Sequence, residues 1–187
     1  MSESKEFAVG SKVVYPAHGV GEIISIDVQK VSGQDFSMYV ISFKKDKMTL
    51  RVPVKRAAES GLRVLSNDND VKKAIVVLKG RAKQGRGMWS RRAQEYEGKI
   101  NSGNIINIAE VVRDLHKNVD DPDRSYSERV IYEAALGRLA GEFAAVNEVT
   151  IDEATNDLVN VLKSRKVTKA NNDDAVIEEI AEEFEAA

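Results

Sequence analysis

The spacing of hydrophobic residues changes once along this chain, near residue 60, and that change restricts the folds the chain can adopt. Between residues 12 and 54, apolar and polar residues alternate in short runs rich in Val, Ile, Tyr and Phe, which is the period of β-strands. Beyond residue 60 the apolar residues recur every three or four positions, which is the period of α-helices. Because the two periods occupy separate parts of the chain, we predict an α+β protein with two domains, residues 1–60 and 61–169.

Turn residues divide the first part into four strand-like runs, at residues 13–15, 22–28, 36–43 and 48–52. Gly33 lies in an expected hairpin turn at residues 31–35, where a positive φ is needed, and Pro53 ends the last run because proline cannot donate to a strand ladder. Four or five short antiparallel strands over about 50 residues favour a small, strongly bent sheet or a partial barrel.

The second part contains five helix-like segments, at residues 71–78, 88–100, 105–117, 125–146 and 154–164. Residues 67–70 are a cluster of capping residues. Residues 125–128, at the start of the fourth segment, and residues 150–153, just before the fifth, each have the spacing of a capping box. Five helices with short connections predict a compact α-helical bundle. Residues 170–187 are acidic, and we interpret them as a tail that is mostly disordered.

The formal net charge of -2 conceals an uneven distribution of charge. Residues 71–94 contain no acid and eight bases, which are Lys72, Lys73, Lys79, Arg81, Lys83, Arg86, Arg91 and Arg92. Residues 171–187 contain seven acids and no base. Because charges more than about 8 Å apart are largely screened at physiological salt, a ligand responds to the local patch more than to the total charge. Net charge therefore does not exclude a nucleic-acid partner.

Composition excludes several classes of site. The chain has no cysteine, so disulfides, thiolate metal sites and cysteine nucleophiles are ruled out. His18 and His116 are the only histidines and fall in different predicted domains, so we expect no metal site, no cofactor and no catalytic residues. No apolar run approaches the roughly 18 residues of a membrane helix, and we expect a cytoplasmic protein that does not enter a membrane.

The basic stretch contains a glycine-spaced loop that resembles a phosphate loop only in part. Residues 80–85 have the required four-residue gap, but Arg86 and Gly87 stand where Lys and Ser or Thr are needed. Both the lysine contact to phosphate and the hydroxyl contact to magnesium are therefore missing. The basic residues of this loop, Lys83 and Arg86 among them, suit a polyanion that lies outside it.

Trp89, the only tryptophan of the chain, follows this loop and admits two interpretations. In the first, its ring is an ordinary anchor in the core of the bundle, and the neighbouring arginines are a solvated face. In the second, the ring is a wedge that parts stacked bases, while Arg86, Arg91 and Arg92 hold the phosphate backbone. Composition alone does not decide between them.

The strand-rich part offers a separate surface at residues 48–54, which we predict to be an edge of the sheet. An edge strand can pair with a strand of another protein through main-chain hydrogen bonds, with Arg51 available for specificity. Alternatively, Lys44, Lys45 and Lys47 merely keep this edge soluble. The residues thus indicate a two-part adaptor, in which a protein-docking β module is joined to a basic helical module.

Several motifs, taken together and in order, resemble the CarD/CdnL family of bacterial RNA polymerase-binding transcription regulators. The resemblance runs from about Phe7 to Ser164. It rests on Phe7-x-Val-Gly-x-Lys-Val-Val-Tyr-Pro-x-His-Gly19 with Gly21, on Leu50-Arg-Val-Pro53, on Trp89-Ser-Arg-Arg92, on Ser102-Gly103, on Ala109-Glu-Val-Val-Arg-Asp-Leu115 and on Ser127-Glu128. The first motif also occurs in a related domain of the transcription-repair coupling factor, but that protein carries helicase domains that this chain is too short to hold.

The resemblance implies a Tudor-like N-terminal domain that docks on the RNA polymerase β subunit. The polymerase-contacting positions implied are Arg51, Gln29, Val31, Leu50 and Pro53. The position of Gln29 is basic in some members of the family, so the departure here removes an ion pair with the polymerase. The acidic extension beyond Lys169 is not part of the family pattern.

The resemblance further implies that the helical domain contacts promoter DNA at the upstream edge of the melted region. Trp89 matches the minor-groove wedge of the family, and Arg91 and Arg92 match its adjoining basic pair. We therefore expect a regulator that stabilises the open complex and is monomeric when free, with the polymerase β subunit and promoter DNA as its partners. Its association with the nucleoid would be indirect, through its binding to RNA polymerase. The alternative is a freestanding or architectural DNA-binding protein that needs no polymerase, and an enzyme is the third choice.

Overall fold

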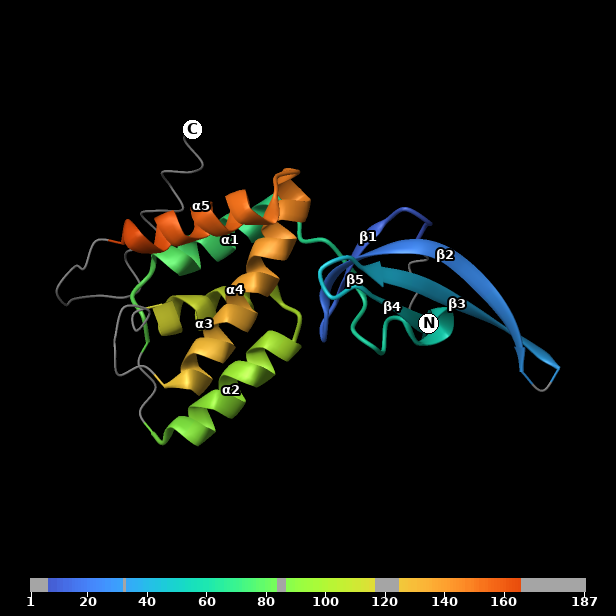
Figure 1. Ribbon diagram of the computed structural model, residues 1–187, viewed down its shortest axis with the longest axis horizontal. Helices are drawn as coiled ribbons and strands as arrows, with labels where there is room; N and C mark the ends of the chain where they lie inside the picture. Colours follow the sequence, from blue (N-terminus) through green and yellow to red (C-terminus); the bar gives the residue numbers. More distant parts are fainter. Residues whose placement is uncertain (1–6, 32, 84–86, 117–124, 166–187) are drawn as a thin grey trace. The chain divides into compact units, whose positions relative to one another are not determined.

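The computed structural model describes residues 7–31, 33–83, 87–116 and 125–165, and the chain divides into two compact units, Met1–Leu65 and Ser66–Ala187 (Figure 1). Each unit is described by itself. The first contains strands β1 (Lys12–Tyr15), β2 (Gly19–Val31), β3 (Gln34–Phe43), β4 (Met48–Pro53) and β5 (Arg63–Val64), with a 3-10 helix η1 at Val54–Arg56. The second contains helices α1 (Asp68–Lys79), α2 (Trp89–Asn101), α3 (Ile105–His116), α4 (Tyr126–Asn147) and α5 (Ile151–Lys163).

The strands form one antiparallel sheet in the order β4-β3-β2-β1-β5. The long β2–β3 hairpin curves strongly (Figure 1), and its register shifts between Ile23 and Ser25, as expected of a β-bulge that bends a strand. One face of the sheet is covered by the unit's core. That core consists of Val13, Ile23, Tyr39, Ile41, Phe43, Val52, Ala57 and Leu62. The predicted α+β class, with a bent antiparallel sheet followed by helices, is confirmed.

Two details of the first unit differ from the sequence-based expectation. The unit continues to Leu65 rather than ending at residue 60, because Arg63–Val64 pairs with β1 as a fifth strand. The turn expected at residues 31–35 is tighter, since the ladder extends to the pair of Val31 with Gln34. Gly33 does adopt the positive φ expected of it, at 81°. The sequence did not reveal β5 because a strand of two residues is too short to show an alternation of apolar and polar residues.

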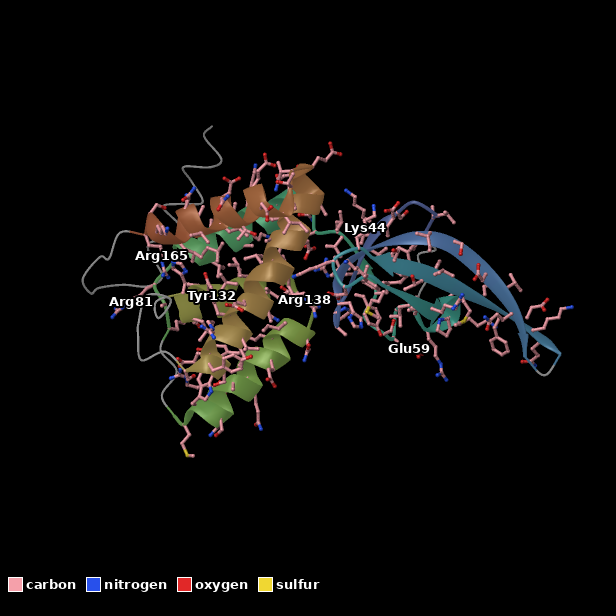
Figure 2. All side chains as sticks on the ribbon, viewed as in Figure 1. Lys44, Glu59, Arg81, Tyr132, Arg138 and Arg165 are labelled. Carbon is pink, nitrogen blue, oxygen red and sulfur yellow. The ribbon has the colours of Figure 1, made fainter. Side chains whose placement is uncertain are left out.

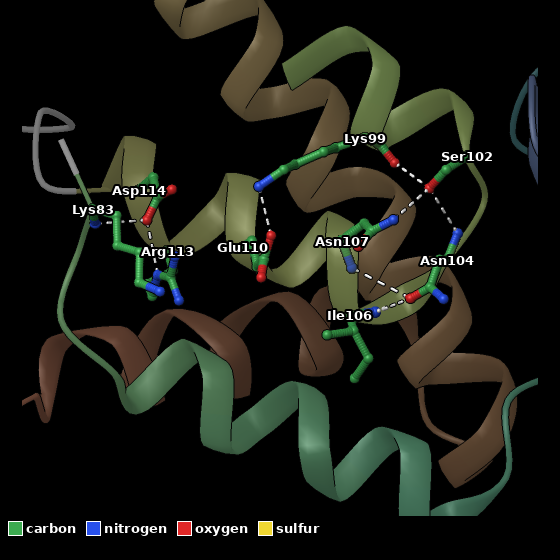
Figure 3. Close-up of polar contacts among 9 residues, drawn as sticks. All are labelled: Lys83, Lys99, Ser102, Asn104, Ile106, Asn107, Glu110, Arg113 and Asp114. Atoms are coloured by element: carbon green, nitrogen blue, oxygen red, sulfur yellow. Dashed lines mark hydrogen bonds and ion pairs between the residues drawn. The ribbon is translucent and has the colours of Figure 1, made fainter. Parts of the chain in front are cut away.

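Helices α1, α3, α4 and α5 begin where local hydrogen-bonding side chains satisfy free N–H groups, whereas α2 begins after Met88, whose side chain makes no capping bond. The Asn67 side chain accepts from the backbone N–H of Asp70 at the start of α1. Ser125 and Thr150 each form a complete capping box, as their spacing predicted, and α5 begins at Ile151 directly after its cap, three residues before the expected residue 154. At the start of α3 the Asn104 side chain accepts from the backbone N–H of Ile106 (Figure 3).

Helix α3 is the centre of the second unit and packs against α1, α2 and α4, while α5 covers α4 and α1 (Figure 1). Its buried apolar side chains are Ile105, Ile108, Ala109, Val111, Val112 and Leu115. The first residue of the unit is tied to α4, because the backbone N–H and the hydroxyl of Ser66 both donate to the buried carboxylate of Glu142. The acidic tail expected at residues 170–187 lies outside the described residues.

Candidate nucleic-acid interface

Trp89 is the first residue of α2, and it is partly buried. Met88, which precedes it, is exposed, whereas the Trp89 ring packs partly against the helical core. The ring centroid is 6.3 Å from that of Tyr96, which is two turns further along α2 and buried. The indole is therefore neither a sealed core residue nor a fully solvated one. Part of the ring packs on the core, and part of it is open to solvent.

Two further contacts hold the indole in place. Its Nε1–H donates to Oγ of Ser127 at 2.8 Å, which joins the start of α2 to the start of α4. The guanidinium carbon of Arg92 lies 5.2 Å from the centroid of the indole ring, within the range of a cation–π contact. The orientation of the ring is thus fixed by residues from two helices.

The two adjacent arginines of α2 point to different surroundings. The Arg91 side chain is 82% exposed, and its ion-pair partner within the described part of the chain is Glu95, one turn along the same helix at the long distance of 3.7 Å. The Arg92 side chain is 24% exposed and contacts Glu128 of α4 at 3.7 Å, and its Nε is buried without a hydrogen-bond partner among the described residues. Of these two arginines, Arg91 is therefore the one that a phosphate could reach. Most of the Arg92 side chain is buried, and its guanidinium contacts Glu128 and the indole ring.

The loop between α1 and α2 is anchored to α3 by one carboxylate. The backbone N–H of Lys83 and Nε of Arg113 both donate to Oδ1 of Asp114, at 2.9 and 2.8 Å (Figure 3). The side chains of Asp114 and Arg113 are almost completely buried. The Lys83 side chain remains exposed, and Arg81 points away from the helices (Figure 2). Arg86 lies outside the described residues.

A pocket of about 270 Å³ lies between the loop, α2 and α3. It is lined by Lys83, Arg92, Glu95, Tyr96, Lys99, Glu110, Arg113 and Asp114. Most of its charge is internally paired, since Lys99 contacts Glu110 and Arg113 contacts Asp114 (Figure 3). Burial, followed by the negative charge of Asp114, raises the pKa of Tyr96, while the guanidinium of Arg92 opposes this rise. This pairing leaves little free positive charge in the pocket for phosphate.

The structure brings together some of the positions expected to contact a polymerase and separates others. Arg51 is opposite Val40 in the ladder and Pro53 is opposite Met38, so both project from the same face of β4, the edge strand of the sheet. Gln29, opposite Phe36, is exposed on that face too. Leu50 projects to the other face and packs partly against the core. Val31 is the last residue of β2, and its side chain is not among those that the structure describes.

The Arg51 side chain is 58% exposed, and its Nε lies 3.8 Å from the Asp27 carboxylate. An exposed ion pair at this distance contributes about 0 to 1 kcal/mol, so Arg51 can leave Asp27 for another partner at little cost. Among the described residues, no cluster of His, Asp and Glu is arranged to hold a metal ion. No described helix combines the length and hydropathy that crossing a membrane requires.

Sequence reasoning missed three residues that shape this interface, namely Ser127, Glu128 and Asp114. Ser127 and Glu128 were noted only for a helix cap and a family motif, although their side chains contact Trp89 and Arg92. Their partners are more than 30 residues away in sequence, so local spacing carried no sign of the contacts. Asp114 follows Arg113 directly, but neither periodicity nor spacing marked it as the anchor of the loop.

Two family models match the chain in the same order as its two units. The model described as the CarD-like/TRCF RID domain matches residues 7–66, and the model described as CarD, C-terminal domain, matches residues 73–160. A Bacillus subtilis (strain 168) protein named "Putative transcription factor YdeB" is 26% identical over 144 residues, which cover 77% of this chain and 94% of that protein. These matches confirm the resemblance seen in the sequence motifs, and the chain belongs to the CarD/CdnL family of transcription regulators.

Proposed function

We propose that this protein docks on the β subunit of RNA polymerase and stabilises the open promoter complex, with Trp89 entering the minor groove at the upstream fork of the bubble. The observation that carries the proposal is the presentation of Trp89. It is a partly exposed indole at the start of a helix, fixed by two neighbouring contacts and adjoined by the exposed guanidinium of Arg91. A ring in this setting can enter between bases while a cation contacts the phosphates.

The sheet unit supplies the tether in this proposal. Strand β4 is an edge of the sheet and carries the exposed, loosely paired Arg51. Such an edge can bind a strand of a partner through main-chain hydrogen bonds. Docking on polymerase would hold α2 near the fork at a high effective concentration, so that weak intrinsic affinity for DNA is sufficient. The family match of residues 7–66 to a domain shared with the coupling factor supports this assignment.

The energetic requirement is modest. Stacking of a base on an aromatic ring contributes about 1 to 3 kcal/mol, and about 1.4 kcal/mol changes an equilibrium tenfold. The ring stabilises the open complex only to the extent that it binds melted DNA better than closed duplex. We therefore expect one side chain to change the lifetime of the open complex by about tenfold or more, with little dependence on base identity.

The first experiment compares open-complex lifetimes for the wild type, Trp89→Ala and Trp89→Phe on one promoter. Alanine should shorten the lifetime without preventing polymerase binding, and phenylalanine should retain part of the effect because it keeps a ring that can stack. Far-UV circular dichroism establishes that each variant is folded. An unchanged lifetime for a folded Trp89→Ala protein would remove the wedge from the proposal.

The second experiment tests the docking surface by capture of a polymerase β-subunit fragment. Arg51→Glu should abolish capture while leaving contact with DNA intact. Lys44→Glu is the matched control, because it makes the same charge reversal at an exposed residue that lies beyond the end of β3. Normal capture by Arg51→Glu would exclude Arg51 from the docking surface. Salt-dependent binding to bare duplex with a Kd of about 10 to 100 nM, without polymerase, would favour the freestanding alternative.

A further inference from the structure

We infer that Ser127 is a positioning residue for Trp89, so that the first turn of α4 holds the indole in the orientation in which it meets DNA. This inference rests on the function proposed above and extends it to a residue that contacts no DNA in the scheme. The central contact is the 2.8 Å hydrogen bond from the indole Nε1–H to Oγ of Ser127. It joins the first turns of two helices that are separated by 38 positions in sequence.

The acceptor is itself held in place by the cap of α4. Ser125 is the N-cap, and its side chain accepts from the backbone N–H of Glu128, whose carboxylate in turn accepts from the backbone N–H of Ser125. Ser127 lies inside this box, and its Oγ is 3.1 Å from Oγ of Ser125. Because the capping box fixes the backbone on both sides of Ser127, the hydroxyl presents a defined acceptor to the indole.

A second contact from the same turn acts on the ring through Arg92. The Glu128 carboxylate is 3.7 Å from the Arg92 guanidinium, which in turn lies 5.2 Å from the centroid of the indole. Successive residues of α4 therefore constrain the indole at two points, directly at its N–H and indirectly at its face. Two torsion angles define the position of a tryptophan side chain, and a bond to the distant N–H restricts both.

This arrangement has a consequence for binding. Immobilising a side chain at an interface costs free energy, and a residue that is already held in its bound orientation avoids this cost. Because its N–H is occupied, the indole is left to act on a base through stacking, which every base can provide. The loss of one hydrogen bond of ordinary strength corresponds to a change of about 2- to 12-fold, which sets the size of the expected effect.

The hydrogen bond can be tested without DNA, because Trp89 is the only tryptophan and all indole fluorescence comes from it. We expect Ser127→Ala to lower the fluorescence anisotropy of the indole and to increase its quenching by acrylamide. Ser127→Thr keeps a hydroxyl and should restore both values. Ser127 is exposed, so neither change should disturb the core, and circular dichroism checks this. Unchanged anisotropy and quenching in the alanine variant would overturn the inference.

The functional arm is a double-mutant cycle on open-complex lifetime, with Trp89→Phe as the second background. Phenylalanine retains an apolar ring but lacks the N–H that Ser127 accepts, so it removes the contact from the other side. Ser127→Ala should shorten the lifetime about 2- to 12-fold in the wild-type background and leave it unchanged in the Trp89→Phe background.

An equal shortening in both backgrounds would show that Ser127 acts by another route and would overturn the inference, even if the proposed function holds. An unchanged lifetime after Ser127→Ala in the wild-type background would likewise overturn it. Failure of the proposed function can be told apart from failure of this inference. If Trp89→Ala leaves the open-complex lifetime unchanged, the proposed function is refuted. The fluorescence measurements would still decide whether Ser127 orients the ring.

Discussion

Replacing Asp114 by alanine is expected to destabilise the helical unit by about 3 kcal/mol, because it leaves a buried guanidinium without its counter-ion. The Asp114 and Arg113 side chains are 6% and 8% exposed, and Nε of Arg113 lies 2.8 Å from the carboxylate. The same oxygen accepts the backbone N–H of Lys83, so the change also frees the basic loop from α3.

The expected magnitude follows from burial. Removing one partner of a buried ion pair costs about 3 to 5 kcal/mol, and the low end applies here because both residues border a pocket that opens to solvent. Glu110→Ala is the matched control, since it removes a carboxylate from the same helix. Its partner is Lys99, and these two side chains are 30% and 38% exposed, so the expected loss is about 1 kcal/mol or less.

Urea unfolding followed by indole fluorescence measures this difference in the helical unit alone, because Trp89 is the only tryptophan and lies in that unit. With a slope of about 2 kcal/mol/M, a loss of about 3 kcal/mol lowers the unfolding midpoint by about 1.5 M. Asp114→Asn should fall between the two variants, because it keeps an oxygen that can accept from Lys83 but loses the charge. Similar midpoints for Asp114→Ala and Glu110→Ala would refute the argument from burial.

The remaining predictions concern backbone space and pH. A Cβ at Gly21 would lie 2.7 Å from the side chain of Ile41, so Gly21→Ala should destabilise the sheet unit by about 1 to 3 kcal/mol, measured by thermal unfolding under circular dichroism. Gly98 in α2 has open space around it, so Gly98→Ala should instead stabilise the helical unit by about 1 kcal/mol in the urea assay. Hydrogen bonds from Thr150 lower the pKa of Glu153 below its ordinary 4.5, so this carboxylate contributes stability above pH 4.5 and loses the contribution as pH falls through the lowered pKa. The stability difference between the wild type and Glu153→Gln should therefore be largest near neutral pH and vanish in acid; a difference that persists in acid would contradict the assignment.

The order and type of most elements could be predicted from the sequence because they depend on interactions between near neighbours. Alternating apolar residues marked β2 and β3, and the three-to-four-residue spacing marked α3. The capping boxes at Ser125 and Thr150 were recognisable because all their groups lie within four residues. Strand β5 escaped prediction because its identity comes from pairing with β1, about 50 positions earlier, and not from a pattern of its own.

The composition of the candidate interface was decided partly by sequence and partly by tertiary packing. Motifs and charge selected Trp89 and its two neighbouring arginines, but adjacent positions on a helix point about 100° apart, so Arg91 and Arg92 could not both share one environment. Packing of α2 against α4 then turned Arg92 toward Glu128 and placed Ser127 at the indole N–H. Such partners depend on how two helices are rotated and set against each other, and the spacing of residues within either helix does not contain that information.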